Sequence, residues 1–475
     1  MNILCKGILS LVINMNESYW QKTTKKEKYP KLDHDMNTDI VIIGGGLTGI
    51  LTAYRLRNAM FNIILLEKDE LGSETSGHTT AKLTYLHDLI YADIDEYYGR
   101  DYTRMYFESN KDALEEIKDI IKEENIECDY KENESIIYTN NETNMLKMKK
   151  EKEILESFGV KVKENVLENA LYSISVDKQG IFHPLKYLYA IADRCKKENI
   201  QIFEHSQVNK VKKVDDYFVI DVNNHKIQCD YVIHATRYPF VYRGLYFMRI
   251  LQEREYVQYG ISQNNNMNSI LCVDHPAIST RPVEKGEIEI GKNEVKNPIQ
   301  WFAQDSEALR IIPYIGRLKY PYDEYIAYGY NKWGMTLSHV ASKIISDDII
   351  GKENKYVELY STSHYSLSLM KEKLPILYNH VKKGMIDNRF NDRVVELKRN
   401  EGAVMKIDDK LTAVYRDDNS QYHYFSPYCP HFKCVIQFNK KTQTWDCPCH
   451  GSTYDAYGHL ILGPSLHDLE RKSEK

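Results

Sequence analysis

The stretch IVIIGGGLTG, from Ile40 to Gly49, joins a short apolar run to three spaced glycines. The apolar run predicts a buried β-strand, and the pattern after the glycines predicts a helix that continues to about Asn58. A second apolar run, NIILLEK, begins at Asn62 and predicts another strand. Because strand, helix and strand in this order form a βαβ unit, the stretch favours an α/β fold with a parallel sheet.

The glycines follow the pattern Gly44-x-Gly46-x-x-Gly49. The first permits the tight turn, the second lets a pyrophosphate approach the backbone, and the third lets the helix pack closely on the strand. Glu67 ends the second strand, 18 residues after Gly49, where a carboxylate accepts hydrogen bonds from ribose hydroxyls. A Gly-rich turn alone is often only a turn, but a strand, a helix N-terminus and an acid in register predict a dinucleotide site. Further predicted contacts are Leu47, Thr48 and Lys68.

Length and composition limit the classes of protein to consider. A chain of 475 residues is too long for one hydrophobic core and indicates two or three domains. The charged fraction of 28% and the net charge of −5 imply neither nucleic acid nor an anionic membrane surface as a partner. No apolar run reaches the ~18 to 20 residues of a membrane span. Five scattered cysteines are typical of reduced thiols, so we expect a cytoplasmic protein.

The other four of the nine cysteines fall within 21 residues near the end of the chain. They lie in two boxes, CPHFKC and CPCHGS, and each box supplies one cysteine and one histidine as ligands. A zinc finger, which is the alternative, usually pairs cysteine with cysteine and histidine with histidine. Two cysteines on one iron and two histidines on the other are the ligands of a Rieske [2Fe–2S] cluster. The predicted cluster ligands are Cys429, His431, Cys447 and His450.

The spacing C-x-H, fifteen residues and C-x-x-H resembles that of Rieske proteins, over about residues 389 to 475. In the cytochrome bc type the remaining cysteine of each box joins a disulfide, which implies a bond between Cys434 and Cys449 here. Two adjacent free thiols are the alternative, because disulfides are rare in the cytoplasm. Lys433 departs from the pattern, since bc-type proteins usually have glycine at this place. The departure puts the loop geometry, and with it the disulfide, in question.

The same resemblance implies groups that surround the cluster. Ser452 and Tyr454 match hydroxyls that donate hydrogen bonds to a cluster sulfide and to a cysteine sulfur. Such donors stabilise the reduced state, so we expect a reduction potential toward the high end of the Rieske class. Pro464, in LGPS, resembles the proline loop that shields the cluster from water.

Four separated segments resemble the D-amino-acid oxidase type of FAD oxidoreductase, over about residues 39 to 351. GSETSGHTTAKLT, from Gly72, is similar to the loop that lies against the pyrophosphate and flavin in that family. EHSQVNKV, YVIHATRYPF and YGYNKWGMTLSHVASKII resemble, in chain order, the adenine contact, a later strand near the FAD and the C-terminal flavin motif. The FAD contacts that the resemblance implies are Gly77, His78, Thr79, Thr80, Ala81, Lys82, Val208, Ala235, Thr236, Gly329, Trp333, Gly334, Met335 and Thr336.

These patterns together predict an α/β FAD-binding Rossmann-like domain with an interleaved α+β substrate domain, followed by a small all-β Rieske domain. The first residues are polar and lack periodicity, so we expect a poorly ordered arm. The expected parts are an N-terminal arm (1–37), the FAD-binding and substrate domain (38–350, with the substrate part at roughly 90–195 and 240–325), a linker (351–388) and the Rieske domain (389–475).

The fusion of these two domains implies a path for electrons. A flavin accepts two electrons as a hydride, and a Rieske centre passes them on one at a time. The sequence holds no second Gly-rich turn of the kind that NAD(P)H-reduced flavoenzymes commonly carry, so we expect electrons to enter from an organic substrate. The wider flavin family oxidises C–N bonds, which implies an amine or amino acid as substrate, with an external protein or quinone as electron acceptor.

Other functions stay open at this point. An electron-transfer protein would exchange electrons between its flavin and a partner protein or quinone. A Rieske oxygenase would need an iron on two histidines and a carboxylate, for which no appended domain is visible, and a redox sensor would use Cys434 and Cys449 as a switch. Arg281 is a weak candidate for binding a substrate carboxylate, because a guanidinium can donate to both oxygens. A surface or structural arginine is the alternative.

Overall fold

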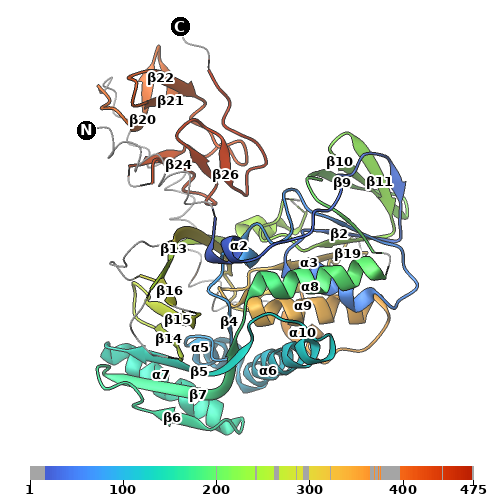
Figure 1. Ribbon diagram of the computed structural model, residues 1–475, viewed down its shortest axis with the longest axis vertical. Helices are drawn as coiled ribbons and strands as arrows, with labels where there is room; N and C mark the ends of the chain where they lie inside the picture. The colour runs from blue at the N-terminus through green and yellow to red at the C-terminus, as the bar shows by residue number, and fades with distance from the viewer. Residues whose placement is uncertain are drawn as a thin grey trace. The chain divides into compact units, whose positions relative to one another are not determined.

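The computed structural model describes residues 17–198, 200–240, 243–261, 267–284, 286–291, 299–320, 323–363, 369, 373, 375, 396–440 and 442–472. The chain divides into two compact units (Figure 1). The larger unit holds Glu17–Ile250 and Glu255–Ser366, and the smaller contains Leu367–Lys475.

A six-stranded sheet, in the order β18-β19-β12-β2-β3-β8, forms the centre of the larger unit. Its strands are parallel except for β18. In β2, Ile40 and Ile42 pack into the main core, while Val41 and Ile43 pack into a second core on the other face. Because both faces are covered, the strand is apolar throughout instead of alternating. The strands are β2 (Ile40–Ile43), β3 (Ile63–Leu66), β8 (Gln201–Phe203), β12 (Tyr231–His234), β18 (Tyr314–Arg317) and β19 (Glu324–Tyr328).

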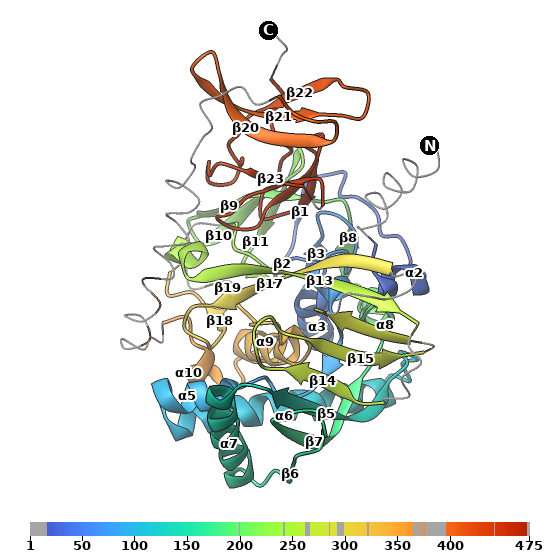
Figure 2. The ribbon, with the colours of Figure 1, turned by 90° about the vertical axis from the view of Figure 1, so that its left-hand side faces the viewer.

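Two different layers cover this parallel sheet (Figure 2). Three helices pack on one face, and a four-stranded sheet in the order β1-β11-β10-β9 packs on the other. The α/β class and the βαβ unit β2-α3-β3 expected from the sequence are therefore confirmed. These layers are α3 (Leu47–Leu56), α8 (Pro184–Lys197), α9 (Gly334–Ile349), β1 (Met36–Asn37), β9 (Val208–Val214), β10 (Tyr217–Val222) and β11 (His225–Cys229).

A second large sheet belongs to the same unit, in the order β17-β13-β16-β15-β14-β5-β7-β4, with β6 beside β7. At one end of this order is β4, which forms the last part of the segment of residues 72–84. Its strands are β4 (Lys82–Leu83), β5 (Lys131–Thr139), β6 (Val162–Glu164), β7 (Tyr172–Ile181), β13 (Ile250–Gly260), β14 (Ser269–Cys272), β15 (Ser279–Val283), β16 (Gly286–Ile290) and β17 (Ile299–Ala308). The remaining helices of the unit are α2 (Tyr19–Thr23), α4 (Thr75–His78), α5 (Ile90–Tyr98), α6 (Arg100–Glu123), α7 (Glu142–Ser157), α10 (Val357–Tyr360) and the 3₁₀ segment η1 (Arg243–Met248).

The expectation of a poorly ordered arm is wrong for residues 17–37. The helix α2 buries Trp20, which is 1% exposed, and β1 pairs in parallel with β11. Only one residue of this five-residue helix, Trp20, is buried. The sequence therefore shows no repeating apolar pattern from which the helix could be predicted.

The expected linker also begins too early. Residues 351–363 belong to the larger unit, because α10 buries Leu359 and Tyr360 completely and the Tyr360 hydroxyl lies 2.8 Å from Ser109 Oγ on α6. A four-residue helix with two buried side chains leaves little trace in the sequence. Residues 364–368, 370–372, 374 and 376–388 of the expected linker lie outside the described residues.

The smaller unit is built from two antiparallel sheets, β20-β21-β22 and β23-β24-β25-β26. Trp445 and Tyr454 face each other across β24 and β25, and both are fully buried in a core that also holds Cys429 and Cys447. The small all-β domain expected from the sequence is confirmed. Its strands are β20 (Glu401–Ile407), β21 (Lys410–Arg416), β22 (Tyr422–Phe425), β23 (Gln437–Asn439), β24 (Thr444–Asp446), β25 (Thr453–Asp455) and β26 (Leu460–Leu462).

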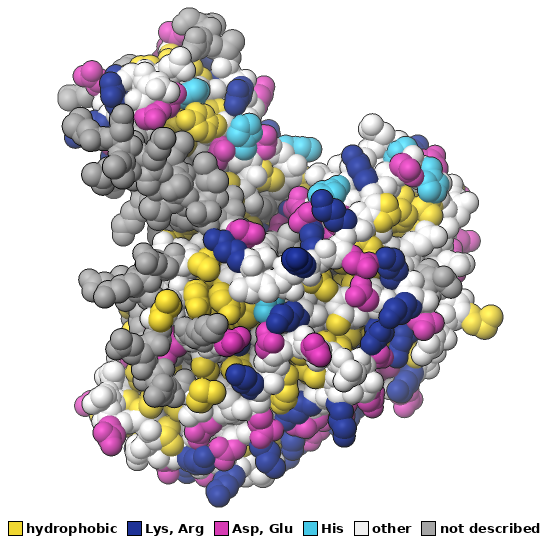
Figure 3. Space-filling view, viewed as in Figure 1, with side chains coloured by type: hydrophobic (Ala, Val, Ile, Leu, Met, Phe, Trp, Pro, Cys, Tyr) yellow, Lys and Arg dark blue, Asp and Glu magenta, His cyan; other side chains and the backbone are white. Residues whose placement is uncertain are grey.

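The surface carries charges of both signs. On the face in Figure 3, Lys and Arg side chains are interspersed with Asp and Glu over the described part of the larger unit. Among the described helices, none has the combined length and apolar character that crossing a membrane requires.

Candidate functional site

The glycine turn between β2 and α3 is shaped by close backbone contacts. Gly44 has φ +114, and a Cβ there would lie 2.6 Å from Ala235 O. A Cβ at Gly49 would lie 2.0 Å from Gly44 O, so glycine is required at both places. Beside Gly46, the helix N-cap, a Cβ would meet only Ser76 Oγ within 4 Å. A side-chain hydroxyl and no backbone atom thus lies close to Gly46 at the helix N-terminus, which fits the approach of a phosphate group.

Glu67 lies at the end of β3, directly against this turn. It is 8% exposed, and its carboxylate accepts hydrogen bonds from Gly45 N at 2.7 Å and Asp69 N at 2.9 Å. Burial raises the pKa of Glu67 to about 7, although the two backbone donors oppose the shift. Lys68 contacts Glu74 at 2.5 Å, and Arg237 contacts the other oxygen of Glu74 at 3.4 Å.

The loop of residues 72–84, called the 72–84 loop below, contains α4 and the expected flavin contacts Gly77 to Lys82. Side chains from other elements hold its backbone carbonyls. Trp301 Nε1 on β17 donates to His78 O at 2.9 Å, and Trp20 Nε1 on α2 donates to Thr79 O at 2.7 Å. Arg281 on β15 donates to Thr80 O and Ala81 O at 3.1 and 3.0 Å. The loop is thus fixed from several sides.

Lys82, at the end of this loop, is held between the strands of the second sheet. Its Nζ donates to Ile270 O at 2.9 Å and to Ser279 Oγ at 2.6 Å. Burial lowers the pKa of Lys82 to about 7; the nearby Arg281 lowers it further, whereas Glu255 raises it. A neutral lysine has two N–H donors and one lone pair, so these two acceptors suit the uncharged amine.

The N-terminus of α9 carries the last group of expected flavin contacts. Trp333 occupies the N-cap position. Its ring stacks on the imidazole ring of His87, with the two ring centroids 4.4 Å apart. The Nε2–H of His87 donates to Thr84 O at 2.7 Å, and its Nδ1 accepts from the Tyr106 hydroxyl at 3.0 Å. Burial lowers the pKa of His87 to about 3, so the stacked imidazole is neutral.

The other expected contacts lie at the ends of strands and in the first turns of α3 and α9. Thr48 Oγ1, on the first turn of α3, lies 2.9 Å from the Tyr330 hydroxyl, and Thr336 donates to Asn110 Oδ1 at 2.8 Å. Ala235 N donates to Ile43 O, which brings the end of β12 to the glycine turn. Val208 begins β9, Leu47 and Thr48 begin α3, Ala235 and Thr236 follow β12, and Gly329, Gly334 and Met335 lie between β19 and the first turn of α9.

The two cysteine and histidine boxes of the smaller unit come together. A hydrogen bond between the two thiols lowers the pKa of Cys429 and raises that of Cys447, and the Tyr454 hydroxyl lies 3.2 Å from Cys429 Sγ. The His431 and His450 rings have their centroids 5.1 Å apart. Two adjacent buried sulfurs and two adjacent imidazoles are the donor set of a Rieske cluster, so the residues present fit that group.

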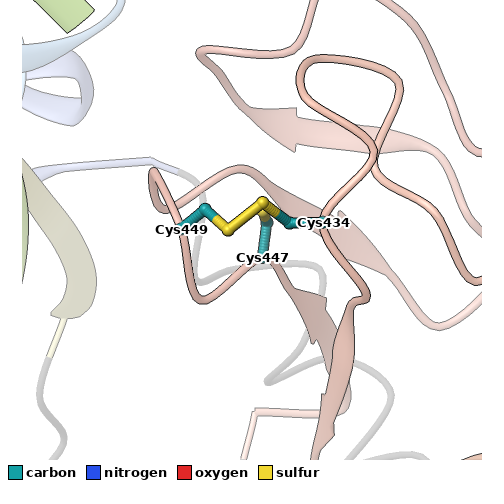
Figure 4. A group of neighbouring side chains, drawn as sticks. All are labelled: Cys434, Cys447 and Cys449. Carbon is teal, nitrogen blue, oxygen red and sulfur yellow. A yellow bond between two sulfur atoms is a disulfide. The ribbon is translucent and has the colours of Figure 1, made fainter. Parts of the chain in front are cut away.

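A disulfide joins Cys434 and Cys449, with the Cys447 sulfur beside it (Figure 4). Since sulfurs bonded to each other do not serve as thiolate ligands, Cys447 is the ligand candidate of this group of three. Lys433 has φ 57, the left-handed conformation that glycine adopts more easily. The loop therefore keeps a glycine-like backbone despite the lysine.

Ser452 and Pro464 lie beside the boxes. Ser452 is fully buried, its Oγ accepts from Ser465 N at 2.9 Å, and its backbone oxygen accepts from Cys447 N. This places the loop that contains Pro464 against the strand that follows the second box.

Comparison with known proteins gives a family for each of the two parts of the chain. The family described as FAD dependent oxidoreductase matches residues 39–297. The chain belongs to this family. The Rieske [2Fe-2S] domain matches residues 390–471, so the cofactors are FAD and a Rieske cluster.

Individual relatives share this organisation to different extents. A protein named as the Rieske 2Fe-2S iron-sulfur protein YhfW, from Bacillus subtilis (strain 168), is 30% identical over 96% of this chain and 97% of its own length. Gamma-glutamylputrescine oxidoreductase from Escherichia coli (strain K12) is 22% identical over 73% of this chain and 92% of its own. Glycine oxidase from Geobacillus kaustophilus has a TM-score of 0.57 and 13% identity, covering 69% of this chain and 99% of that chain, and shows the fold alone.

Within this FAD-dependent oxidoreductase, the contacts of Arg281 fit the alternative given above, an arginine with a structural role. Its side chain is 3% exposed and donates to the carbonyls of Thr80, Ala81 and Phe182. These contacts support the structural alternative, and the role of Arg281 as a ligand of a substrate carboxylate stays a prediction. Spacing along a strand predicts where an arginine lies but not which groups it meets.

Sequence reasoning missed three residues that contact the expected flavin-binding residues: Trp20, His87 and Trp301. The residues SYWQ, Ser18 to Gln21, match the S-x-x-Q form of a capping box, which was a usable signal for the helix that carries Trp20. We find no comparable signal for Trp301 or for the stack of His87 on Trp333.

Proposed function

We propose that this protein is a dehydrogenase that oxidises a C–N bond of an amine or amino acid at FAD and passes the electrons through its Rieske cluster to an external protein or quinone. The observation that carries the proposal is the presence, in one chain, of a flavin-family unit and of two facing cysteine and histidine boxes. One of the compared relatives, gamma-glutamylputrescine oxidoreductase, is named for acting on an amine, which supports the substrate class.

The chain's own residues would hold FAD at three places. The turn from Gly44 to Gly49 offers the N-terminus of α3 for the pyrophosphate, and Glu67 offers a carboxylate for the ribose. The 72–84 loop and the N-terminus of α9 would bind the flavin. When bound, FAD accepts two electrons as a hydride and the cluster transfers single electrons.

Cys429 and Cys447 would hold one iron of the cluster, and His431 and His450 the other. Thiolates are the ligands that iron requires, and Cys429 and Cys447 are both buried and hold no disulfide. The Tyr454 hydroxyl, 3.2 Å from Cys429 Sγ, would donate to a cluster-bound thiolate and so favour the reduced cluster.

Lys82 is the residue that we propose accepts a proton from the substrate. An amine substrate arrives mainly as an ammonium ion, which must lose a proton before a hydride can leave its carbon. Lys82 Nζ, with two neighbours that accept its N–H groups and a pKa of about 7, is suited to receive that proton.

An anaerobic titration tests the proposal. Purified protein is titrated with amino acids and N-methyl amines while flavin absorbance and the EPR signal of the reduced cluster are followed together. We expect one compound to bleach the flavin, with the cluster signal rising after it. If no compound reduces the flavin but dithionite reduces both centres, the protein is an electron carrier between partner proteins. If intact protein gives no Rieske signal, the cluster assignment is wrong.

A further inference from the structure

The short helix α2 is stabilised at its own N-terminus. Gln21 N donates to Ser18 Oγ at 3.2 Å, and Ser18 N donates to Gln21 Oε1 at 2.8 Å. A five-residue helix is too short to be stable alone, so this reciprocal cap and its tertiary contacts keep it formed. Its side chains therefore have defined positions.

Two side chains of α2 donate to the 72–84 loop. Trp20 Nε1 donates to Thr79 O at 2.7 Å, and Gln21 Nε2 donates to Ser73 O at 3.4 Å. The carbonyls on either side of Thr79 O are taken by Trp301 and Arg281 from the second sheet. The loop is thus held between α2 and that sheet.

The same helix is anchored to the rest of the larger unit. The Tyr19 ring lies 4.5 Å from Tyr259 on β13, and Thr23 Oγ1 lies 3.0 Å from His183 Nε2 at the start of α8. The Arg281 guanidinium lies over the Trp20 ring at 4.9 Å. Because these anchors come from β13, β15 and α8, α2 ties three separate elements to the 72–84 loop.

The loop needs such support. Ala81 has φ 56, an unfavourable left-handed conformation for a residue with a Cβ, and it is fully buried. A backbone held in an unfavourable region persists only where surrounding contacts impose it. The donors to Thr79 O, Thr80 O and Ala81 O are those contacts.

We propose that residues Ser18 to Thr23 form a strap that fixes the 72–84 loop in its flavin-binding shape and so sets how tightly the protein holds FAD. Trp20 is the main positioning residue of this strap. The inference rests on contact between the 72–84 loop and FAD, which is part of the proposed function, but it does not depend on the substrate or the electron acceptor.

Replacing Trp20 by phenylalanine keeps most of the ring and removes the N–H donor to Thr79 O. We expect Trp20→Phe to raise the Kd for FAD about five- to tenfold, the effect of losing one buried hydrogen bond. Trp20→Ala, which also empties the buried site, should raise the Kd further. The control is Trp445→Phe, because Trp445 is equally buried and donates its Nε1–H to Ala456 O in the smaller unit.

The experiment uses the full-length holoprotein. FAD release is followed by flavin fluorescence, rebinding to the apoprotein gives the Kd, and visible circular dichroism and the flavin reduction potential report the flavin surroundings. An altered flavin signal in Trp20→Phe, with an unchanged cluster EPR signal and unfolding temperature, supports the strap. An unchanged Kd and flavin signal would overturn it, as would an equal loss of FAD in Trp445→Phe.

A second variant covers poor folding of Trp20→Phe. Gln21→Met keeps the size of the side chain but removes both its donor to Ser73 O and its acceptor for Ser18 N. It should also weaken FAD binding, by a smaller factor, and wild-type binding in this variant counts against the strap. No substrate is present in these measurements, so failure to find an oxidised amine leaves them interpretable.

Discussion

The Tyr454 hydroxyl lies 3.2 Å from Cys429 Sγ, so a residue of β25 reaches a ligand candidate of the first box. The ring itself is fully buried opposite Trp445. The packing of the two-ring core thus sets the position of a hydrogen-bond donor beside the proposed cluster.

Tyr454→Phe should lower the reduction potential of the cluster. Loss of one donor to sulfur, worth about 1 kcal/mol, corresponds to roughly 40 mV for one electron. Protein-film voltammetry or an EPR-monitored redox titration measures it. Tyr457→Phe is the control, since Tyr457 is 38% exposed and packs on Tyr415 and His423. An unchanged potential in Tyr454→Phe would contradict the proposed donor.

Removing the Cys434–Cys449 disulfide with the double change to alanine should destabilise the smaller unit. A bond across a sequence separation of 15 restricts the unfolded chain and is worth about 3 kcal/mol. Denaturant unfolding followed by the visible absorbance of the cluster reports the loss. Cys229→Ala, at a buried thiol of the larger unit, should leave this transition unchanged. Equal stability of the double variant and the wild type would show that the bond is not formed in the purified protein.

FAD should bind more tightly as the pH rises through about 7. Glu67 has a raised pKa of about 7, and its ionised form is the better acceptor for ribose hydroxyls. The ionised fraction grows up to about tenfold between roughly pH 6 and 8, so the Kd should fall by up to that factor. Titrations of the apoprotein at several pH values measure it.

Glu67→Gln should remove most of this pH dependence, whereas Glu123→Gln on the exposed side of α6 should keep it. For stability the sign is opposite. The folded chain binds a proton at Glu67 more tightly than the unfolded chain, so this group's contribution to the free energy of unfolding decreases as the pH rises from about 4.5 to 7.

Lys82→Met should abolish an inflection near pH 7 in the rate of flavin reduction by an amine. In the wild type the rate should rise as Lys82 loses its proton, because only the neutral amine accepts one from the substrate. Lys82→Arg, which stays charged, should be slow at every pH. Stopped-flow reduction across pH 6 to 9 tests this, and an unchanged profile in Lys82→Met would remove Lys82 from the mechanism.

Arg281→Gln should lower the thermal stability of the larger unit. Loss of a substrate ligand would instead change the substrate affinity alone. The change removes charged donors to Thr80 O, Ala81 O and Phe182 O, at a cost of about 2 to 3 kcal/mol. Thermal unfolding of the larger unit and FAD retention are the readouts, with Arg104→Gln on α6 as control. A raised KM with unchanged stability would show instead that Arg281 binds a substrate carboxylate.

Local patterns in the sequence were sufficient for the fold class, the family and the two cofactors. The run from Ile40 to Gly49 predicts a buried strand that turns into a helix, and its glycines allow the close backbone contacts that the structure shows. The spacing of Cys429, His431, Cys447 and His450 is likewise specific because few metal groups take two sulfurs and two imidazoles in this order.

The tertiary structure alone decided what Trp20, His87 and Arg281 do. Each acts through atoms that lie far along the chain: Trp20 Nε1 bonds Thr79 O, the His87 ring stacks on Trp333, and Arg281 bonds Phe182 O. Side-chain type and periodicity carry information about burial, but a hydrogen bond depends on two groups that meet only when the sheets pack. For this reason the sequence by itself predicted the cofactors, whereas the supports of the 72–84 loop became visible only in the folded chain.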